Sequence, residues 1–71
     1  MIISINDAAE RLGATADEVI DAAGLTLGEL EYAAEQCGMF PERYREAPIL
    51  PESRVESLVS RIADARLDLM F

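Results

Sequence analysis

The sequence has no histidine, no lysine and no tryptophan, and its single cysteine is Cys37. Without histidine the chain has no side chain that ordinarily titrates near neutral pH and no imidazole to bind a metal. Ser-His-Asp and Cys-His catalytic arrangements are therefore excluded. One cysteine cannot form an internal disulfide bond, so the composition does not indicate an oxidising compartment. These absences argue against an enzyme and against a disulfide-stabilised fold.

Long apolar runs and phosphate-binding loops are also missing. No stretch approaches the ~18 apolar residues of a membrane-spanning helix, and no secretory leader begins the chain, so we expect a cytoplasmic protein. The glycines are isolated and form no phosphate-binding loop, and the carboxylates do not follow the spacing of a calcium loop. We therefore expect no metal and no cofactor. Cys37 follows an apolar stripe with Leu30 and Ala33, which favours a core position over a reactive thiol.

The chain is short but has the composition of a globular protein. Its 71 residues are 51% apolar and 28% charged. A chain of this size forms a small core, because it buries only about 60% of the surface that its unfolded form exposes. We predict a single compact helical domain spanning residues 1–71.

Negative charge dominates, and it is unevenly distributed. The net charge is −8. Residues 1–42 hold nine acidic residues against Arg11 alone, whereas residues 43–71 hold five of each sign. Affinity for a nucleic-acid duplex comes largely from Lys and Arg, so the first 42 residues are poorly suited to it. An acidic surface favours a basic protein partner instead, although such charge can also serve only to keep a small protein soluble.

A repeated sequence device marks the expected helix starts. The capping-box pattern, in which a hydroxyl residue precedes an acid by three positions, occurs at Ser4, Thr15, Thr26 and Ser53. Gly13, Gly24 and Gly38 each follow a periodic segment, where a left-handed residue commonly ends a helix. An all-α fold is expected, with helices near 5–12, 16–23 and 27–37, a short turn at 41–46 and a longer amphipathic helix near 52–69. Residues 1–3 read as extended, but no strand partner is visible.

The C-terminal helix has one apolar face. Its members follow the spacing of a helical stripe and are Val55, Leu58, Val59, Ile62, Ala65 and Leu69. A helix of this length beside three short ones is predicted to be the spine on which they pack. Leu67, Met70 and Phe71 are further apolar residues that are not needed to complete this face. They either close the core or contact a second chain, as a homodimer or as part of a larger assembly.

Residues 4–23 have the pattern of two short helices joined by a tight turn. This segment resembles the helix-turn-helix superfamily, most closely excisionase-like and MerR-like DNA-binding domains, and it is also similar to the N-terminal subdomain of bacterial translation initiation factor two. The positions that carry the resemblance are Ile5, Ala8, Ala9, Leu12, Gly13, Val19 and Ala22. The resemblance covers about 20 residues and implies a shape rather than a ligand.

The second helix of this segment departs from DNA-reading members of the superfamily. It presents acids where they offer Arg, Lys or amide side chains to phosphates and base edges. The expected protein-interaction surface is therefore acidic and consists of Asp17, Glu18, Asp21, Glu31 and Glu35. If the chain binds nucleic acid instead, the candidate residues are Arg43, Arg45 and Arg54. The competing interpretation of these arginines is ordinary surface ion pairing.

Three functional hypotheses remain. The first is a small acidic, non-catalytic protein that binds a basic protein surface; phage-encoded inhibitors of host machinery and nucleic-acid mimics are proteins of this kind. The second is a helix-turn-helix DNA-binding regulator or excisionase-like protein. The third is a structural subunit of a larger assembly, such as a phage particle.

Overall fold

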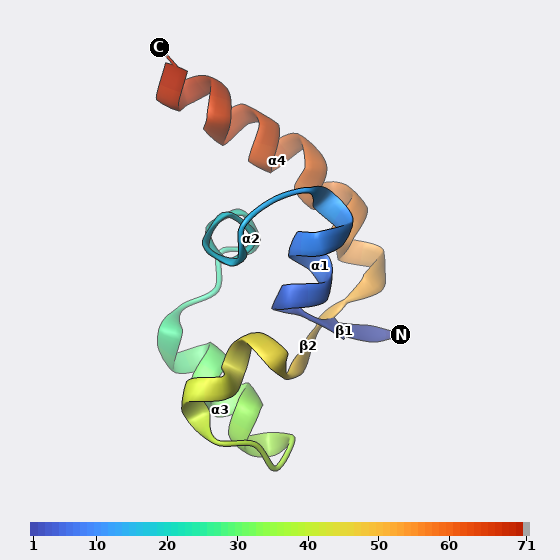
Figure 1. Cartoon of the computed structure of the whole chain (residues 1–71), viewed down its shortest axis with the longest axis vertical. Coiled ribbons are helices and arrows are strands. Elements are labelled where there is room, and N and C mark those ends of the chain that lie inside the picture. The colour runs from blue at the N-terminus through green and yellow to red at the C-terminus, as the bar shows by residue number, and fades with distance from the viewer. Residues whose placement is uncertain (71) are drawn as a thin grey trace.

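The computed structural model describes residues 1–70, and it is mostly helical with a small two-stranded antiparallel sheet (Figure 1). The elements are β1 (Ile2–Ser4), α1 (Ile5–Leu12), α2 (Ala16–Ala23), α3 (Leu27–Gln36), the 3₁₀ helix η1 (Pro41–Glu46), β2 (Pro48–Pro51) and α4 (Glu52–Met70). The predicted helix positions are confirmed, with boundaries that agree within a residue.

Three of the four predicted caps form. The hydroxyls of Ser4, Thr15 and Thr26 each accept a hydrogen bond from the backbone N–H three residues later. Gly13 and Gly24 end α1 and α2 in the left-handed conformation, with φ of 63° and 69°, which glycine adopts without steric cost.

The fourth predicted cap, at Ser53, is wrong. Helix α4 already begins at Glu52, so Ser53 lies inside the helix. The backbone N–H of Glu52 donates to the carbonyl oxygen of Met1 at 2.9 Å. The carbonyl of Met1, just before β1, therefore satisfies one of the first-turn N–H groups of α4 that have no partner within the helix.

The extended N-terminal segment does have a strand partner, contrary to the expectation. β1 pairs antiparallel with β2, with Ile3 opposite Leu50, and the register shifts between Ile3 and Ser4. Both Ile3 and Leu50 are buried. Sequence patterns did not reveal the pair because the strands are short, distant in sequence, and β2 both begins and ends with proline, which cannot donate to a ladder.

One hydrophobic core joins the elements. Its fully buried large side chains are Ile5, Val19, Leu30, Leu50 and Leu58. Ala8 and Ala9 of α1 are also buried, and small side chains at such positions allow α1 and α2 to approach closely across the Gly13 turn. Helices α1 to α4 all supply buried residues to the core, whereas η1 has none and only packs Tyr44 against it.

The prediction that α4 is the spine for all three short helices is only partly correct. Helix α4 packs against α1, α2 and β2, whereas α3 packs chiefly against η1 and also contacts β2. Figure 1 shows α3 at the opposite end of the molecule from the C-terminal turns of α4. The molecule is accordingly elongated, with principal extents of 41 × 22 × 15 Å.

The predicted apolar face of α4 is buried only in part. Val55, Leu58 and Ile62 are in the core, but Val59 is 54% exposed and Leu69 is 88% exposed. A helix rises about 1.5 Å per residue, so α4 is roughly 28 Å long and the two helices beneath it are each roughly 12 Å long. Helices α1 and α2 are therefore too short to cover the last turns of α4.

The predicted core position of Cys37 is wrong. Cys37 is exposed at the end of α3, with its Sγ 4.0 Å from the carbonyl oxygen of Pro48. Only Leu30 and Ala34 of α3 are buried. Because α3 is covered on one side only, the apolar stripe that ends at Cys37 extends beyond the part of α3 that packs against the rest of the chain.

Candidate functional site

Three arginines of α4 hold α2 in place. Arg61 Nη1 donates to the carbonyl oxygen of Ala22 at 3.1 Å, and Arg54 Nη2 donates to that of Ala23 at 3.4 Å. These carbonyls belong to the last turn of α2, which carries the negative end of the helix dipole and has no basic residue of its own. We call the three α4 arginines, Arg54, Arg61 and Arg66, the arginine clamp.

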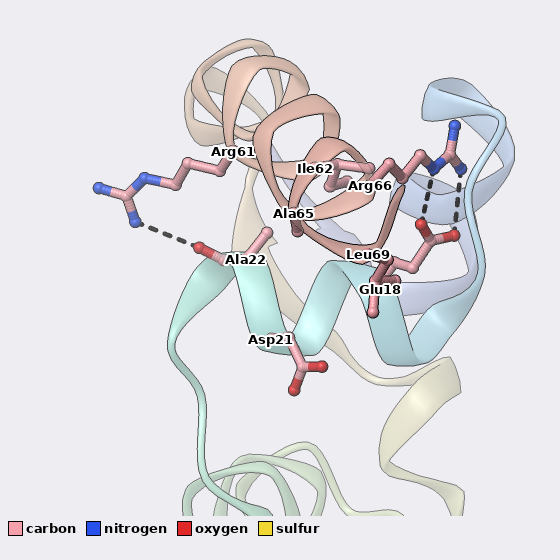
Figure 2. Close-up of a pocket in the computed structure, with 8 residues that line it drawn as sticks. All are labelled: Glu18, Asp21, Ala22, Arg61, Ile62, Ala65, Arg66 and Leu69. Atoms are coloured by element: carbon pink, nitrogen blue, oxygen red, sulfur yellow. Dashed lines mark hydrogen bonds and ion pairs between the residues drawn. The ribbon is translucent and has the colours of Figure 1, made fainter. Parts of the chain in front are cut away.

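The third clamp residue, Arg66, binds the other end of α2. Its guanidinium pairs with Glu18 through two contacts, 2.7 Å from Nε to Oε2 and 3.1 Å from Nη2 to Oε1 (Figure 2). Nη2 also donates to the carbonyl oxygen of Gly13 at 3.2 Å. A bidentate pair of this kind fixes both the distance and the orientation of the two helices.

Glu18 is therefore engaged rather than free. Besides pairing with Arg66, its carboxylate accepts the backbone N–H of Thr15 at 3.0 Å and completes the capping box of α2. The bond to Arg66 and the Thr15 backbone N–H lower the pKa of Glu18 to about 2. The carboxylate of Glu18 therefore stabilises the contact between α2 and α4, and its charge is largely compensated by Arg66.

A groove of about 320 Å³ lies between α2 and the projecting half of α4 (Figure 2). Its apolar lining consists of Ala22, Ile62, Ala65 and Leu69, and its charged rim of Glu18, Asp21, Arg61 and Arg66. In Figure 2, Asp21 points away from α4. The groove has room for an apolar side chain but combines no nucleophile with a base.

A smaller hollow of about 140 Å³ lies on the other side of α4. Its lining residues are Leu12, Val59, Ile62, Ala63 and Arg66. The projecting half of α4 therefore has incompletely covered apolar surface toward α1 as well as toward α2.

The other three arginines also bind acceptors within the chain. Arg11 pairs with Glu52 at 3.0 Å. Arg43 Nε lies 2.8 Å from Glu46 Oε2; this pair raises the pKa of Arg43 and lowers that of Glu46. Arg45 lies 3.4 Å from Asp17 and over the ring of Tyr44.

The candidate nucleic-acid residues do not form a free basic patch. Arg43 and Arg45 lie in η1 and each contacts a carboxylate, while Arg54 lies at the start of α4 and binds the end of α2. Each guanidinium thus serves a different intramolecular acceptor. Ordinary surface pairing, the competing interpretation, accounts for the contacts of Arg43 and Arg45.

The candidate acidic residues lie on two helices. Asp17, Glu18 and Asp21 belong to α2, and Glu31 and Glu35 belong to α3. Asp17 contacts Arg45 yet keeps 81% of its side-chain surface exposed. Asp21, Glu31 and Glu35 have no ion-pair partner within residues 1–70. They carry the uncompensated charge of the predicted surface.

The candidate oligomer contacts are exposed where the structure describes them. Leu67 is 50% exposed and Met70 is 80% exposed, while Phe71 lies outside the described residues. Sequence reasoning assigned Leu69 to the core and so missed it as a surface residue. It also missed the arginine clamp, although the seven-residue spacing of Arg54 and Arg61 places both on one side of α4.

No family model, curated protein or solved structure matches the chain. Within residues 1–70, no three His, Cys, Asp or Glu side chains are arranged to hold a metal ion. The described helices also include none with the length and apolar character needed to cross a lipid bilayer.

Proposed function

We propose that this chain is a non-catalytic binding protein that uses an acidic surface on a helix-turn-helix scaffold to bind a basic protein partner. The observation that carries the proposal is the internal use of positive charge. All six arginines bind carboxylates or backbone carbonyls of the same chain. The chain thus offers a partner few uncommitted cations, while most of its fourteen acids remain uncompensated.

The arrangement of α1 and α2 supports the helix-turn-helix scaffold. The two helices pack together across a turn made by Gly13, and Ala9 and Val19 are buried in the same core. In this interpretation α2 is the helix that would face a ligand. Its exposed acids Asp17 and Asp21 would repel phosphate and attract Lys and Arg side chains.

The test is binding to a partner captured from lysate, compared between two charge-matched variants. In Asp21→Lys/Glu35→Lys, two uncompensated acids of the proposed surface are reversed. In the control, Glu10→Lys/Glu56→Lys, two exposed acids outside the predicted set are reversed, so the net charge changes equally. We expect the first variant to lose at least tenfold in affinity and the control to lose less than threefold.

Salt and nuclease separate the alternatives. Binding to a basic protein should survive nuclease treatment and weaken as salt shortens the Debye length from about 10 Å at 0.1 M. A DNA-binding regulator would instead shift duplex DNA at low salt and lose that shift in Arg43→Ala/Arg45→Ala. Equal loss of affinity in both charge-reversal variants would show that net charge, rather than this surface, drives binding.

A further inference from the structure

We propose that the basic partner inserts a large apolar side chain into the groove between α2 and α4, while its lysine or arginine side chains bind the acids beside that groove. The inference rests on the proposed function, because it assigns the anchoring point of the same partner. It specifies a partner segment that is both basic and amphipathic. Its support comes from the apolar lining of the groove, from the contacts of its arginines and from the unpaired acids along its edges.

The apolar lining of the groove is only partly covered by the chain. Exposure rises along α4 from 5% at Ile62 to 88% at Leu69, although both residues line the groove. Ala22 and Ala65 leave space between the two helices, because an alanine side chain fills little of it (Figure 2). The volume of about 320 Å³ accommodates a leucine, isoleucine or phenylalanine side chain. An apolar pocket inside a polar rim is the usual site of an anchoring residue at a protein interface.

The two arginines of the groove already bind acceptors on or beside α2. Arg66 is paired with Glu18 through two contacts, so its charge is largely neutralised. Arg61 donates to the carbonyl oxygen of Ala22 at 3.1 Å. These contacts disfavour a phosphate or a carboxylate as the ligand of this groove, because both guanidinium groups would have to exchange an existing partner.

Unpaired acids border the groove on both helices. Asp21 lies on its α2 side. Asp64 and Asp68 follow lining residues of α4 by three positions, which places them along the same edge of that helix. All three side chains are exposed, and none has an ion-pair partner within residues 1–70. With the paired acid of α2 included, the groove and its edges hold four acids against two arginines.

This excess of acids selects a basic occupant. A second copy of the chain would bring the same excess to the contact and would be repelled. A nucleic acid would place phosphates against unpaired carboxylates. A segment that carries lysine or arginine beside an apolar side chain gains both charge attraction and apolar burial here. An amphipathic helix with basic flanks has this chemistry, and docking of such a helix in an apolar groove is a common mode of recognition.

Three synthetic peptides test the proposal by NMR titration. The lysine–leucine peptide carries leucines along one helical face and lysines elsewhere; in the lysine–alanine peptide the leucines become alanine, and in the glutamate–leucine peptide the lysines become glutamate. We expect the lysine–leucine peptide to bind at least tenfold more tightly than either of the others, because burial of one leucine side chain alone supplies a factor of about ten. The largest amide shifts should fall at Ala22, Ala65 and Leu69.

Matched variants locate the site. Ala65→Phe fills the groove, whereas Ala63→Phe places the same side chain in the hollow on the other side of α4. Asp68→Lys reverses an acid at the edge of the groove, whereas Glu56→Lys makes the same charge change nearer the start of α4. Ala65→Phe should weaken binding of the lysine–leucine peptide about tenfold and Asp68→Lys about threefold, and each control should change it less than twofold. All four replaced side chains are exposed, so each variant should keep the helical circular dichroism of the wild type.

The outcomes separate this inference from the proposed function. Equal affinity for the lysine–leucine and lysine–alanine peptides, or equal effects of Ala65→Phe and Ala63→Phe, would overturn the groove as the anchoring point and leave an acidic binding surface in place. The same holds if the lysine–leucine peptide produces no amide shifts around the groove at about 1 mM. Tightest binding of the glutamate–leucine peptide would overturn the basic occupant in favour of an acidic one, such as a second copy. Equal losses in Asp21→Lys/Glu35→Lys and its control would instead contradict the proposed function.

Discussion

Two regions of this molecule are built in different ways. The clamped body, formed by α1, α2 and α4, is held by buried side chains from all three helices and by three arginines that join α4 to α2. The lateral lobe, formed by α3 and η1, buries only Leu30 and Ala34. Of its two ion pairs, Arg43 with Glu46 joins residues three apart in sequence, and Arg45 with Asp17 joins η1 to α2.

The body therefore holds the long-range contacts that stabilise the fold, and the lobe holds acidic side chains that remain available at the surface. In the body, contacts between distant parts of the chain use up the arginines and compensate Glu18. In the lobe, Glu29, Glu31 and Glu35 have no ion-pair partner within the described chain. Regions with few buried apolar contacts open at lower free-energy cost. We therefore expect the lobe to be the more adaptable of the two regions.

The largest expected effect comes from breaking the body. Leu58 is 1% exposed in α4, and Leu58→Ala should cost about 2–5 kcal/mol through lost burial and the cavity that remains. A core of this size rarely supplies more than about 3–5 kcal/mol in total. Circular dichroism should show that Leu58→Ala is largely unfolded at 25 °C. A cooperative melt close to that of the wild type would contradict the importance of the body.

Truncating the lobe should have a more local effect. Leu30→Ala removes the largest buried side chain of α3, and we expect it to accelerate hydrogen exchange in α3 and η1 more than in α1 and α2. The measurement is amide exchange by mass spectrometry on matched peptides. Uniform acceleration along the chain would mean that the lobe and the body unfold as one unit.

Two helix caps give a matched comparison of intermediate size. Replacing an N-cap threonine with alanine costs typically ~1 kcal/mol. Thr26→Ala should cost more than Thr15→Ala, because the Thr26 hydroxyl also donates to Glu29 Oε1 at 3.0 Å, whereas the backbone N–H that Thr15 donates to Glu18 is kept in alanine. Urea denaturation of both variants measures the difference. Equal costs would show that the bond from the Thr26 hydroxyl to Glu29 adds nothing to the cap.

The pH dependence of stability should also differ between the ion pairs of the body and of the lobe, although the effect is smaller than those above. The pKa of Glu18 falls from 4.5 to about 2 in the folded chain. A depressed carboxyl pKa stabilises the fold above pH 4.5 and loses that contribution as the pH falls toward 2. Glu18→Gln should therefore be less stable than wild type at neutral pH and lose less stability across this window, as measured by urea denaturation at each pH.

The smallest effect is expected from the local pair of the lobe. Glu46→Gln also removes a carboxyl whose pKa is lowered by Arg43, but both side chains are about half exposed and close in sequence. Exposed pairs of this kind contribute little. We expect Glu46→Gln to lose less stability at neutral pH than Glu18→Gln loses, as measured in the same titration. A larger loss would mean that η1 is held by this pair rather than by its packing on α3.

Local signals predicted the helices well and their assembly poorly. Ser4, Thr15 and Thr26, together with the glycines after each helix, set boundaries through hydrogen bonds that span three or four residues. Ser53 matched the same pattern and failed, because α4 begins one residue earlier, at Glu52, whose backbone N–H binds the carbonyl oxygen of Met1. The candidate site was predicted only in part: its acids were named, but neither the groove nor the clamp was foreseen.

The sequence by itself determined the helical segments, their caps and the excess of negative charge in the first 42 residues. Only the tertiary structure decided which charges remain available. It pairs Glu18 with Arg66 and leaves Asp21 unpaired within the described chain, although both belong to α2. It also decided that Leu69 is exposed while Leu58 is buried, because burial depends on where α1 and α2 end beneath α4. Such outcomes depend on contacts between distant residues, which no local pattern encodes.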